Sequence, residues 1–240
     1  MAVKLERVRA ELHFHLLPGV DDGPQSMDEA LAVARLTVAD GTSTVVATPH
    51  ARDVDIASVP ERVAEVQGAL DAAAVPLRVL PGVELAQDDH VTADELEIAA
   101  HGPPGRRWVL LEAPLFLDAP GLLAAATDLA GRGYGLLIGH PERSTDLMTN
   151  GGLDELLDAG AKLQINGSSV LGRHGGRARG WAIELARSGQ AAVLASDAHR
   201  PSRGPVLTEA VRTLVEAGVA PEKAERMVSA TPRALLESGL

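Results

Sequence analysis

The sequence predicts an α/β fold in which seven parallel strands close into a barrel, and three observations lead to this prediction. Seven short apolar runs alternate with Ala- and Leu-rich amphipathic segments, which is typical of parallel strands joined by right-handed crossovers. No linker or shift in composition divides the 240 residues, so a single domain over 1–240 is expected. Six of the seven runs carry a His, Asp or Glu at or just past their C-terminal end. In a barrel those ends meet at one mouth, whereas in an open sheet few of them could meet.

The predicted strands are short and built from Leu, Val, Ile and Ala, because the chain holds only five aromatic residues with which to fill a core. Runs of this length bounded by turn residues are read as buried strands. In chain order they cover residues 9–14, 44–48, 77–83, 108–112, 135–139, 161–165 and 191–195.

Helices are predicted between these strands. The first opens at Ser26 with a capping-box pattern and ends near Asp40, where a glycine follows. Ser58 opens the next helix by the same pattern, and Thr92 starts a shorter one. Further helices are predicted near 120–131, 151–159, 176–188, 205–217 and 221–237.

Composition excludes several classes of protein. With 22 basic and 33 acidic side chains the net charge is −11, which argues against nucleic-acid partners and adhesion to anionic lipid. The absence of cysteine excludes disulfides, Cys-ligated zinc and enzymes with a thiolate nucleophile. The first residues are charged, and no uncharged apolar run reaches the roughly 18 residues of a membrane span. A cytoplasmic protein without membrane insertion is expected.

Two pairs of side chains with metal-ligand spacing lie on the first strand and after the last one. His13 and His15 alternate along a strand and therefore point to the same side. Asp197 and His199 repeat this spacing. Either pair alone is more often a chance arrangement than a metal site. In a closed barrel, however, the first and last strands are neighbours, and the conjunction of the two pairs favours a metal site.

Further candidate ligands follow the other strands. Glu84 and Glu112 lie in very apolar segments, where a carboxylate is unfavourable unless it binds a metal or forms a salt bridge with Lys or Arg. Asp22, His50 and His140 also fall at strand ends. Nine ligands are too many for one ion and suit two or three divalent ions. Nitrogen and oxygen donors without sulfur fit Mn, Fe or Zn.

These residues belong to seven short motifs that together resemble the polymerase-and-histidinol-phosphatase (PHP) superfamily. Within it, the chain is most similar to the manganese-dependent protein-tyrosine phosphatases of bacterial capsule and exopolysaccharide systems. The resemblance runs from about residue 11 to 237. The motifs, in order, are His13-x-His15, Leu-Pro-Gly-Val-Asp-Asp-Gly-Pro at 17–24, Thr48-Pro49-His50, Gly82-Val83-Glu84, Leu111-Glu112, His140-Pro141-Glu142-Arg143 and Ser196-Asp197-Ala198-His199.

The resemblance implies a distorted seven-stranded (β/α)7 barrel of the PHP fold with three metal ions, Mn being favoured over Fe or Zn. Matching the motifs one by one distributes the nine ligands over three positions. The first would be held by His13, His15, Glu84 and Asp197; the second by Glu84 as a bridge, with Glu112 and His140; the third by Asp22, His50 and His199.

Two arginines are implied as phosphate-binding residues. Arg143 matches a family arginine that grips phosphate. Arg203 lies near a second one, but the segment Arg-Pro-Ser-Arg-Gly-Pro inverts the expected Gly-Arg order, so Arg200 competes with it. Glu11 stands where the family usually has Asp.

The predicted function is that of a metal-dependent phosphoric monoester hydrolase acting on phosphotyrosine in proteins and releasing inorganic phosphate. By resemblance this activity is linked to the regulation of polysaccharide synthesis, and a capsule-type tyrosine kinase is a candidate partner. Without cysteine, and with Asp53-Val54-Asp55 a poor match to an aspartyl-phosphate motif, a metal-activated hydroxide is the attacking group that remains. A small-molecule phosphatase such as histidinol-phosphate phosphatase, and a catalytically silent barrel that binds a phosphorylated partner, are the alternatives.

The sequence is less informative about the substrate pocket. A phenolic leaving group needs less protonation than an alkoxide, which favours aryl phosphates. Phe14, Leu115 and Phe116 are candidates to line a phenol pocket, although such residues more often belong to a core. His101 is expected on the surface. His174, in a Gly- and Arg-rich loop, is expected near the mouth, either solvated or in contact with substrate.

Overall fold

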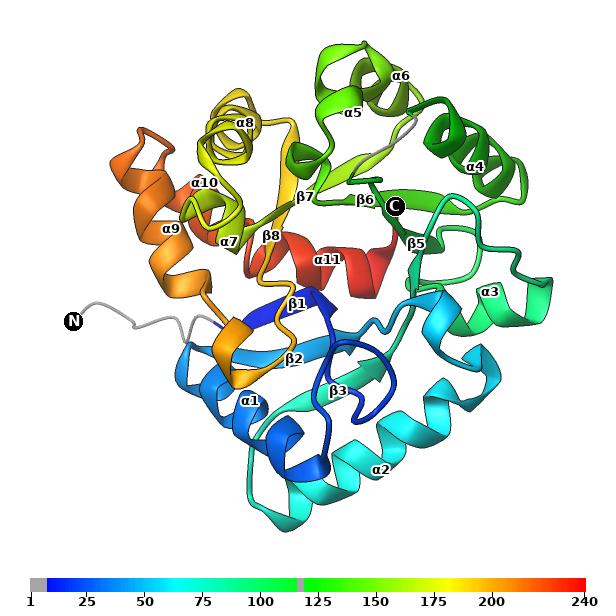
Figure 1. Cartoon of the computed structure of the whole chain (residues 1–240), viewed down its shortest axis with the longest axis vertical. Coiled ribbons are helices and arrows are strands. Elements are labelled where there is room, and N and C mark those ends of the chain that lie inside the picture. Colours follow the sequence, from blue (N-terminus) through cyan, green and yellow to red (C-terminus); the bar gives the residue numbers. More distant parts are fainter. Residues whose placement is uncertain (1–7, 116–118) are drawn as a thin grey trace.

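Parallel strands run through the middle of the molecule and helices surround them (Figure 1). The computed structural model describes residues 8–115 and 119–240. Within these ranges one sheet has the order β1-β2-β3 and a second has the order β4-β5-β6-β7-β8. The strands are β1 (Arg9–Phe14), β2 (Thr42–Ala47), β3 (Arg78–Pro81), β4 (Glu84–Leu85), β5 (Trp108–Glu112), β6 (Gly135–Gly139), β7 (Lys162–Asn166) and β8 (Ala191–Ala195).

Helices fill the connections and cover the outer faces of the sheets, as when α1 packs on β2, α4 on β6 and α8 on β8. The α-helices are α1 (Met27–Ala39), α2 (Val59–Ala72), α3 (Ala93–Ala99), α4 (Ala119–Gly131), α5 (Thr145–Thr149), α6 (Gly152–Asp158), α7 (Gly167–Val170), α8 (Gly176–Ser188), α9 (Leu207–Glu216), α10 (Pro221–Arg226) and α11 (Ala230–Ser238). Four single-turn 3₁₀ helices are η1 (Ala51–Asp53), η2 (Ile56–Ser58), η3 (Pro141–Arg143) and η4 (Pro201–Arg203).

The α/β class and the parallel pairing are confirmed, and four strands have the predicted bounds. The predicted strand over 77–83 is wrong in one respect, because it divides into β3 and β4 at Gly82. Pro81 has no N–H to donate to a neighbouring strand. A Cβ on Gly82 would lie 2.5 Å from Val46 Cγ1, so the chain passes too close to β2 for any side chain there. The break allows the chain to leave the first sheet and enter the second.

The two sheets meet at two seams, each marked by an isolated bridge. Phe14 pairs with Ala198 beyond β8, and His50 beyond β2 pairs with Glu84 in β4. The described residues therefore form eight strands in two sheets, and a closed seven-stranded barrel is not confirmed. Both seams lie where strands end, and both include or adjoin predicted ligands.

Helix boundaries follow the predicted signals at two of three N-termini. The Ser26 side chain accepts from Glu29 N–H at the start of α1, and Thr92 and Glu95 form a complete capping box at α3. The capping prediction at Ser58 is wrong, because its hydroxyl donates to Asp55 O at 2.7 Å. The single helix predicted over 221–237 is also wrong. It is two helices, since Pro232 has no N–H to continue a helix from α10.

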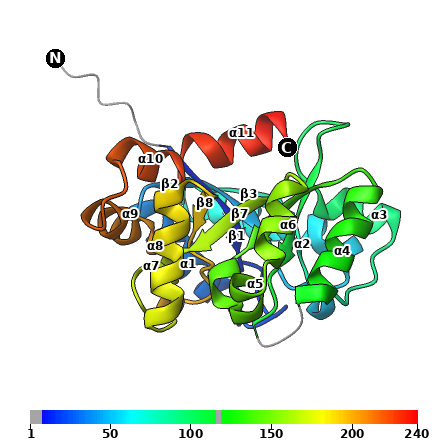
Figure 2. The ribbon, with the colours of Figure 1, turned by 90° about the horizontal axis from the view of Figure 1, so that it is seen from above.

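An inner apolar cluster occupies the space between the sheets and reaches α11. Its buried members are Leu12, Val46, Trp108, Leu110, Leu137, Val193 and Leu235. The Trp108 indole N–H donates to Leu235 O at 2.9 Å, so this helix is held to the first residue of β5. Figure 2 shows α11 on the side of the molecule away from α5 and α7.

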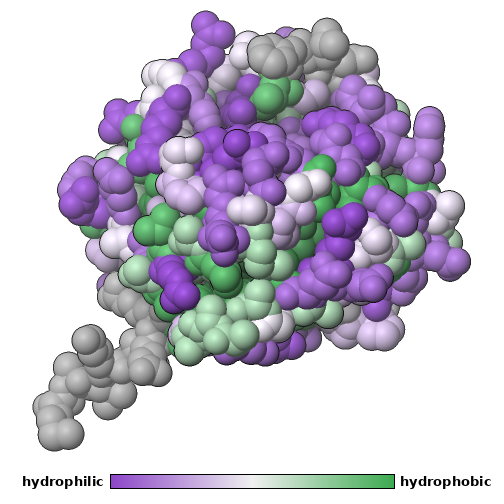
Figure 3. Space-filling model, turned by 60° about the horizontal axis from the view of Figure 1, so that its bottom comes forward, coloured by the Kyte–Doolittle hydropathy of each residue, from purple (hydrophilic) through white to green (hydrophobic). Residues whose placement is uncertain are grey.

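The surface is mainly polar. In the face shown in Figure 3, hydrophilic residues cover most of the outline, and hydrophobic ones show in recesses between them. Among the described residues, Leu36 is the single large hydrophobic side chain that counts as exposed. In the same part of the chain, no helix combines the length and apolar character that a membrane crossing requires.

Candidate metal centre

All nine sequence-predicted ligands lie together at the C-terminal ends of the strands and in the loops that follow them. Their donor atoms fall into four overlapping groups, within each of which the atoms lie within 4.8 Å of one another. The groups are His15, Asp22, His50 and His199; His13, His15 and Asp197; His13, Glu84 and His140; and His50, Glu84 and Glu112. The overlap means that the groups form one continuous ligand cluster.

Glu84 lies at the centre of this cluster. Its Oε1 is 3.0 Å from His13 Nε2 and 3.4 Å from His140 Nε2. Its Oε2 is 3.0 Å from His50 Nδ1. The side chain is buried, and Oε1 has no hydrogen-bond partner in the described structure. A buried carboxylate oxygen surrounded by imidazole nitrogens is the arrangement that a cation would satisfy.

Asp197 is the second carboxylate at the centre. Its Oδ1 lies 3.4 Å from Nε2 of both His13 and His15. Its Oδ2 accepts from Asn166 Nδ2 at 2.9 Å. One oxygen is thus held by an amide while the other faces the two imidazoles. This division is common for carboxylates that bind metals, since an outer partner fixes the ligand's orientation.

The imidazole rings are oriented by outer partners in the same way. His13 Nδ1 lies 2.8 Å from Gln164 Oε1, and His15 Nδ1 lies 2.7 Å from Asp21 Oδ2. His199 Nδ1 lies 2.8 Å from Asp197 O. With Nδ1–H donated to these acceptors, each ring turns its Nε2 towards the carboxylates of the cluster.

Sequence reasoning missed three of the orienting residues, Asp21, Gln164 and Asn166. Asp21 also accepts from Gly23 N–H at 2.9 Å, which holds the loop after β1. Its position next to Asp22 was a usable signal, since both belong to one motif. Gln164 lies within the apolar run of β7, and nothing in its sequence context distinguishes it from a core residue.

The pKa values reflect the crowding of opposite charges. Burial alone would lower the pKa of His13, but the carboxylates of Glu84 and Asp197 raise it to about 9. Burial works against ionisation of Asp197 as well, yet His13 and His15 hold its pKa at about 2. The carboxylates are therefore ionised and demand positive charge. Divalent cations would supply that charge in place of protons on the imidazoles.

Two ligands adopt a left-handed backbone conformation that is rare outside glycine. The φ angle is 36° at His140 and 50° at Asp197. Such conformations cost about 1–3 kcal/mol each and are found mainly at functional sites. His140 directly follows β6, and Asp197 lies two residues beyond the end of β8. In both cases the turn brings the side chain to the cluster.

The competing explanation of the buried glutamates, a salt bridge to Lys or Arg, does not apply to Glu84. No Lys or Arg of the described ranges forms an ion pair with it. Glu112 has one such contact among the described residues. Its Oε2 lies 3.9 Å from Nη2 of Arg52, whose guanidinium is exposed. Nitrogen and carboxylate donors in this number, without a buried cationic side chain, fit divalent metal ions.

Three arginines were weighed as phosphate-binding residues, and their surroundings differ. Arg143 Nη1 lies 3.6 Å from Asp197 Oδ2. Arg203 Nη1 lies 2.9 Å from Asp22 Oδ2. Arg200 Nε instead donates to the backbone oxygens of Asp22 and Gly23. The guanidiniums of Arg143 and Arg203 thus face the carboxylates of the cluster, whereas Arg200 holds a loop.

Glu11 lies outside the ligand cluster and supports it. It is fully buried, and its Oε2 accepts from Ser196 N–H at 2.8 Å. Burial raises the pKa of Glu11 to about 7. The hydrogen bond holds the backbone immediately before Asp197, so the longer side chain still reaches the last strand.

The remaining candidates have mixed outcomes. Phe14 is a fully buried core residue. Phe116 lies outside the described residues, while Leu115 borders a cleft beside Arg143. The surface position predicted for His101 is wrong. Its Nε2 is buried without a hydrogen-bond partner, and its ring lies 5.1 Å from that of Trp108.

His174 borders the same cleft as Leu115, near the ligand cluster. The residue is half-buried, and its Nδ1 lies 3.0 Å from Ser169 Oγ. Burial, reinforced by the nearby guanidinium of Arg143, lowers the pKa of His174 to about 4. The predicted position near the mouth is therefore confirmed, and the imidazole is neutral at pH 7.

Comparison with known proteins adds family and activity to this geometry. A family model described as capsular polysaccharide synthesis, CpsB/CapC, matches residues 9–237. The chain is 30% identical over 195 residues to the tyrosine-protein phosphatase YwqE of Bacillus subtilis (strain 168), covering 79% of this chain and 76% of that protein.

Solved structures show the same relationship. One comes from work on YwqE of Bacillus subtilis and CpsB of Streptococcus pneumoniae, described as unique metal-dependent tyrosine phosphatases. It superposes with a TM-score of 0.84 at 26% identity, covering 96% of both chains. An organophosphorus hydrolase variant from Deinococcus radiodurans superposes at 0.59 with 17% identity, covering 96% of this chain and 93% of that one. The second similarity concerns the fold alone.

Proposed function

The chain belongs to the CpsB/CapC family of capsular polysaccharide synthesis, and on that premise we propose that it is a metal-dependent phosphatase acting on phosphotyrosine in proteins. One observation carries the proposal. Nine histidine and carboxylate side chains form one cluster with the buried Glu84 at its centre, and two guanidiniums face this cluster. Among the described residues, Glu84 Oε1 has no hydrogen-bond partner. The similarity to YwqE and CpsB supports phosphotyrosine as the substrate.

In this proposal the ligand cluster holds up to three divalent ions, Mn being favoured over Fe or Zn. Ions bound there supply Lewis acidity and make water a better nucleophile near neutral pH. The family resemblance distributes the ligands over three positions: His13, His15, Glu84 and Asp197; Glu84, Glu112 and His140; and Asp22, His50 and His199. The same nine side chains make up the four overlapping groups of the structure, which supports binding of more than one ion.

The arginines bind the phosphoryl oxygens of the substrate. Arg143 and Arg203 approach the cluster from different loops, after β6 and after β8. Planar guanidiniums can form paired hydrogen bonds with phosphate, which fixes its orientation. A phenolic oxygen, with a pKa near ~10, leaves with less protonation than an alkoxide does, which fits a site where no general acid is assigned.

The finer description of the fold belongs to the same proposal. We take residues 1–240 as a single domain with a distorted seven-stranded (β/α)7 barrel of the PHP type. Counting β3 and β4 as one interrupted strand supports this description, as do the bridges at the two seams. The substrate is a phosphotyrosine protein, with a capsule-type tyrosine kinase as the candidate, and the second product is inorganic phosphate. A cytoplasmic location stays a prediction.

The test is turnover of p-nitrophenyl phosphate, a phosphotyrosine peptide and histidinol phosphate, each with Mn²⁺ and with EDTA. We expect metal-dependent hydrolysis of the two aryl phosphates and little of histidinol phosphate. Activity that persists after complete metal removal contradicts the proposal. A preference for histidinol phosphate would favour a small-molecule phosphatase, and binding of the peptide without turnover in metal-loaded protein would favour a silent barrel.

A further inference from the structure

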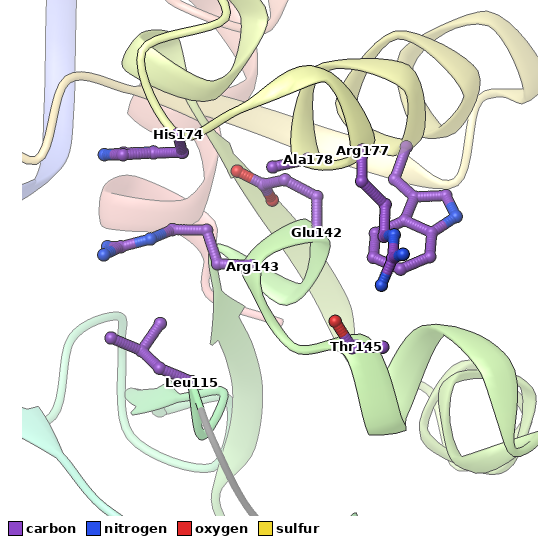
Figure 4. A pocket seen from close by; sticks show the side chains of 8 residues that line it. Leu115, Glu142, Arg143, Thr145, His174, Arg177 and Ala178 are labelled. Carbon is purple, nitrogen blue, oxygen red and sulfur yellow. The ribbon is translucent and has the colours of Figure 1, made fainter.

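A cleft opens beside the candidate metal centre, between the loop after β6 and helix α8. Its volume is about 400 Å³. Arg143 belongs both to the cleft and to the surroundings of the ligand cluster, since it lines the first and faces Asp197 of the second. In Figure 4, Leu115 and Arg143 lie on one side, with Arg177 and Thr145 on the other. A group attached to a phosphate at the metal centre can therefore enter the cleft past Arg143.

Two residues of α8 form the far wall. The Arg177 guanidinium carbon lies 5.9 Å from the centroid of the Trp181 ring. This cation–π contact gives the guanidinium a preferred position over the ring. Arg177 is exposed, and no carboxylate of the described ranges lies within ion-pair distance of it. The other arginine of the cleft, Arg143, faces Asp197 and is assigned to the phosphate of the substrate, so Arg177 is the guanidinium available to a group attached to that phosphate.

The charge of the cleft contrasts with that of the chain. The protein has a net charge of −11, yet two arginines line this cleft. Among the described residues that line it, the one acidic side chain is Glu142, which is buried and whose Oε1 accepts from Asn166 N–H at 2.9 Å. The accessible charge is therefore positive. Leu115 and the half-buried Trp181 add apolar surface.

We propose that this cleft is a subsite for the peptide segment next to the phosphotyrosine, and that Arg177 selects an acidic side chain there. The inference rests on the proposed function. A carboxylate on the segment can form paired hydrogen bonds with the guanidinium held over Trp181. Because the pair is partly exposed to solvent, we expect a preference of about fivefold rather than an absolute requirement.

The experiment compares two phosphotyrosine peptides that differ only in carrying Glu or Gln beside the phosphotyrosine. The measured quantity is the ratio of their kcat/KM values with Mn-loaded enzyme. We expect wild type to favour the Glu peptide, Arg177→Gln to abolish the preference, and Arg177→Glu to favour the Gln peptide. The matched control is Arg187→Glu on the same helix, an equal change in charge outside the cleft, which should keep the wild-type ratio.

Binding gives a second readout that needs no turnover. The chain has two tryptophans, and Trp108 is fully buried in the inner apolar cluster, so Trp181 is the one placed to report on the cleft. Titration with a non-hydrolysable phosphonate version of the Glu peptide should change tryptophan fluorescence in wild type. The change should be lost in Trp181→Phe, and it should require more peptide in Arg177→Glu.

The outcomes separate this inference from the proposed function. If Mn-loaded enzyme hydrolyses neither peptide, the proposed function fails, and the fluorescence titration alone decides the subsite. If both peptides are hydrolysed but Arg177→Glu keeps the wild-type ratio, the subsite is overturned while the phosphatase stands. Equal binding of the phosphonate peptide by wild type and Arg177→Glu overturns the subsite as well.

Discussion

The ligand cluster and the inner apolar cluster are built from neighbouring residues of the chain, but burial affects the free energy of their side chains in opposite ways. Leu12 belongs to the inner cluster and His13, the next residue, to the ligand cluster. Both side chains are fully buried. Burial of Leu12 is favourable in itself, whereas burial of His13 depends on charged partners that face it. The same strands therefore stabilise the fold through the inner apolar cluster and place charged groups that need partners in the ligand cluster.

Two histidines, each with a buried ring nitrogen, make this contrast measurable. The carboxylates of Glu84 and Asp197 raise the pKa of His13 to about 9 against the effect of burial. His101 lies against Trp108 without a carboxylate partner, and burial lowers its pKa to about 4, with a smaller contribution from Arg107. The residue type is the same, so the difference is due to the surroundings alone. Of these two histidines, the one that carboxylates accompany is the one in the ligand cluster.

The largest expected effect follows from removing the central carboxylate. Glu84→Ala should lower kcat/KM for p-nitrophenyl phosphate by about 10³-fold or more, because the metal ligands lose their shared partner. Bound Mn, measured by elemental analysis, should fall with it. The exposed Glu61→Ala on α2 is the control. If Glu84→Ala binds as much Mn as wild type does, Glu84 is not the central ligand, and the contrast between the ligand cluster and the inner apolar cluster is contradicted.

Truncation in the inner cluster should act on stability instead. Trp108→Ala removes a fully buried indole and its hydrogen bond to Leu235 O, which should cost about 3–5 kcal/mol of unfolding free energy. Urea denaturation measures this loss. Activity per bound metal in the folded fraction should stay near wild type. Trp108→Phe, which keeps most of the packing, should lose less, and an equal loss would indicate that the hydrogen bond dominates.

The arginines beside the ligand cluster should affect turnover without affecting metal content. Arg143→Ala should lower kcat/KM by about 10- to 100-fold, as expected for a lost hydrogen bond to a charged group. Arg203→Ala should have a smaller effect because Arg203 is more exposed. Arg200→Ala should have the least effect on turnover, since its guanidinium holds backbone oxygens. The reverse order would reassign the phosphate-binding residues.

The smallest expected effect is a pH dependence that comes from His101. Its pKa in the folded state, about 4, lies below the usual 6.5, so the unfolded chain binds the proton first as pH falls. The stability contribution is therefore complete above about pH 6.5 and is lost as pH falls towards 4. For a partly exposed residue we expect about 1–2 kcal/mol.

His101→Phe keeps a ring against Trp108 and cannot titrate. The difference in unfolding free energy between this variant and wild type, both loaded with Mn, should change between pH 7 and pH 5 in favour of the variant. Parallel pH profiles for the two proteins would show that His101 does not titrate across this range.

Local patterns predicted much of the fold because they depend on neighbouring residues. The alternation of apolar runs located the strands, and the side chains of Ser26 and Thr92 cap helices three residues from their partners. The break between β3 and β4 was not predictable in this way. It depends on how closely Gly82 approaches Val46, which is distant in sequence.

In the candidate site, too, some residues could be predicted from the sequence and others could not. Residue types at strand ends and in the loops that follow them were enough to name nine candidate ligands, which the structure brings together, because parallel strands end on the same side. The residues that orient these ligands could not be identified from the sequence. Gln164 meets His13 across 151 positions of the chain, at 2.8 Å, and only packing brings them together.

The sequence by itself determined the class of fold, the order of the strands and the residues with metal-binding chemistry, because these follow from periodicity and side-chain type. The tertiary structure alone decided that His101 Nε2 is buried, that His140 and Asp197 turn with positive φ, and that Arg177 lies over Trp181. The physical reason is that these features depend on distances between segments far apart in the chain, which no local pattern encodes.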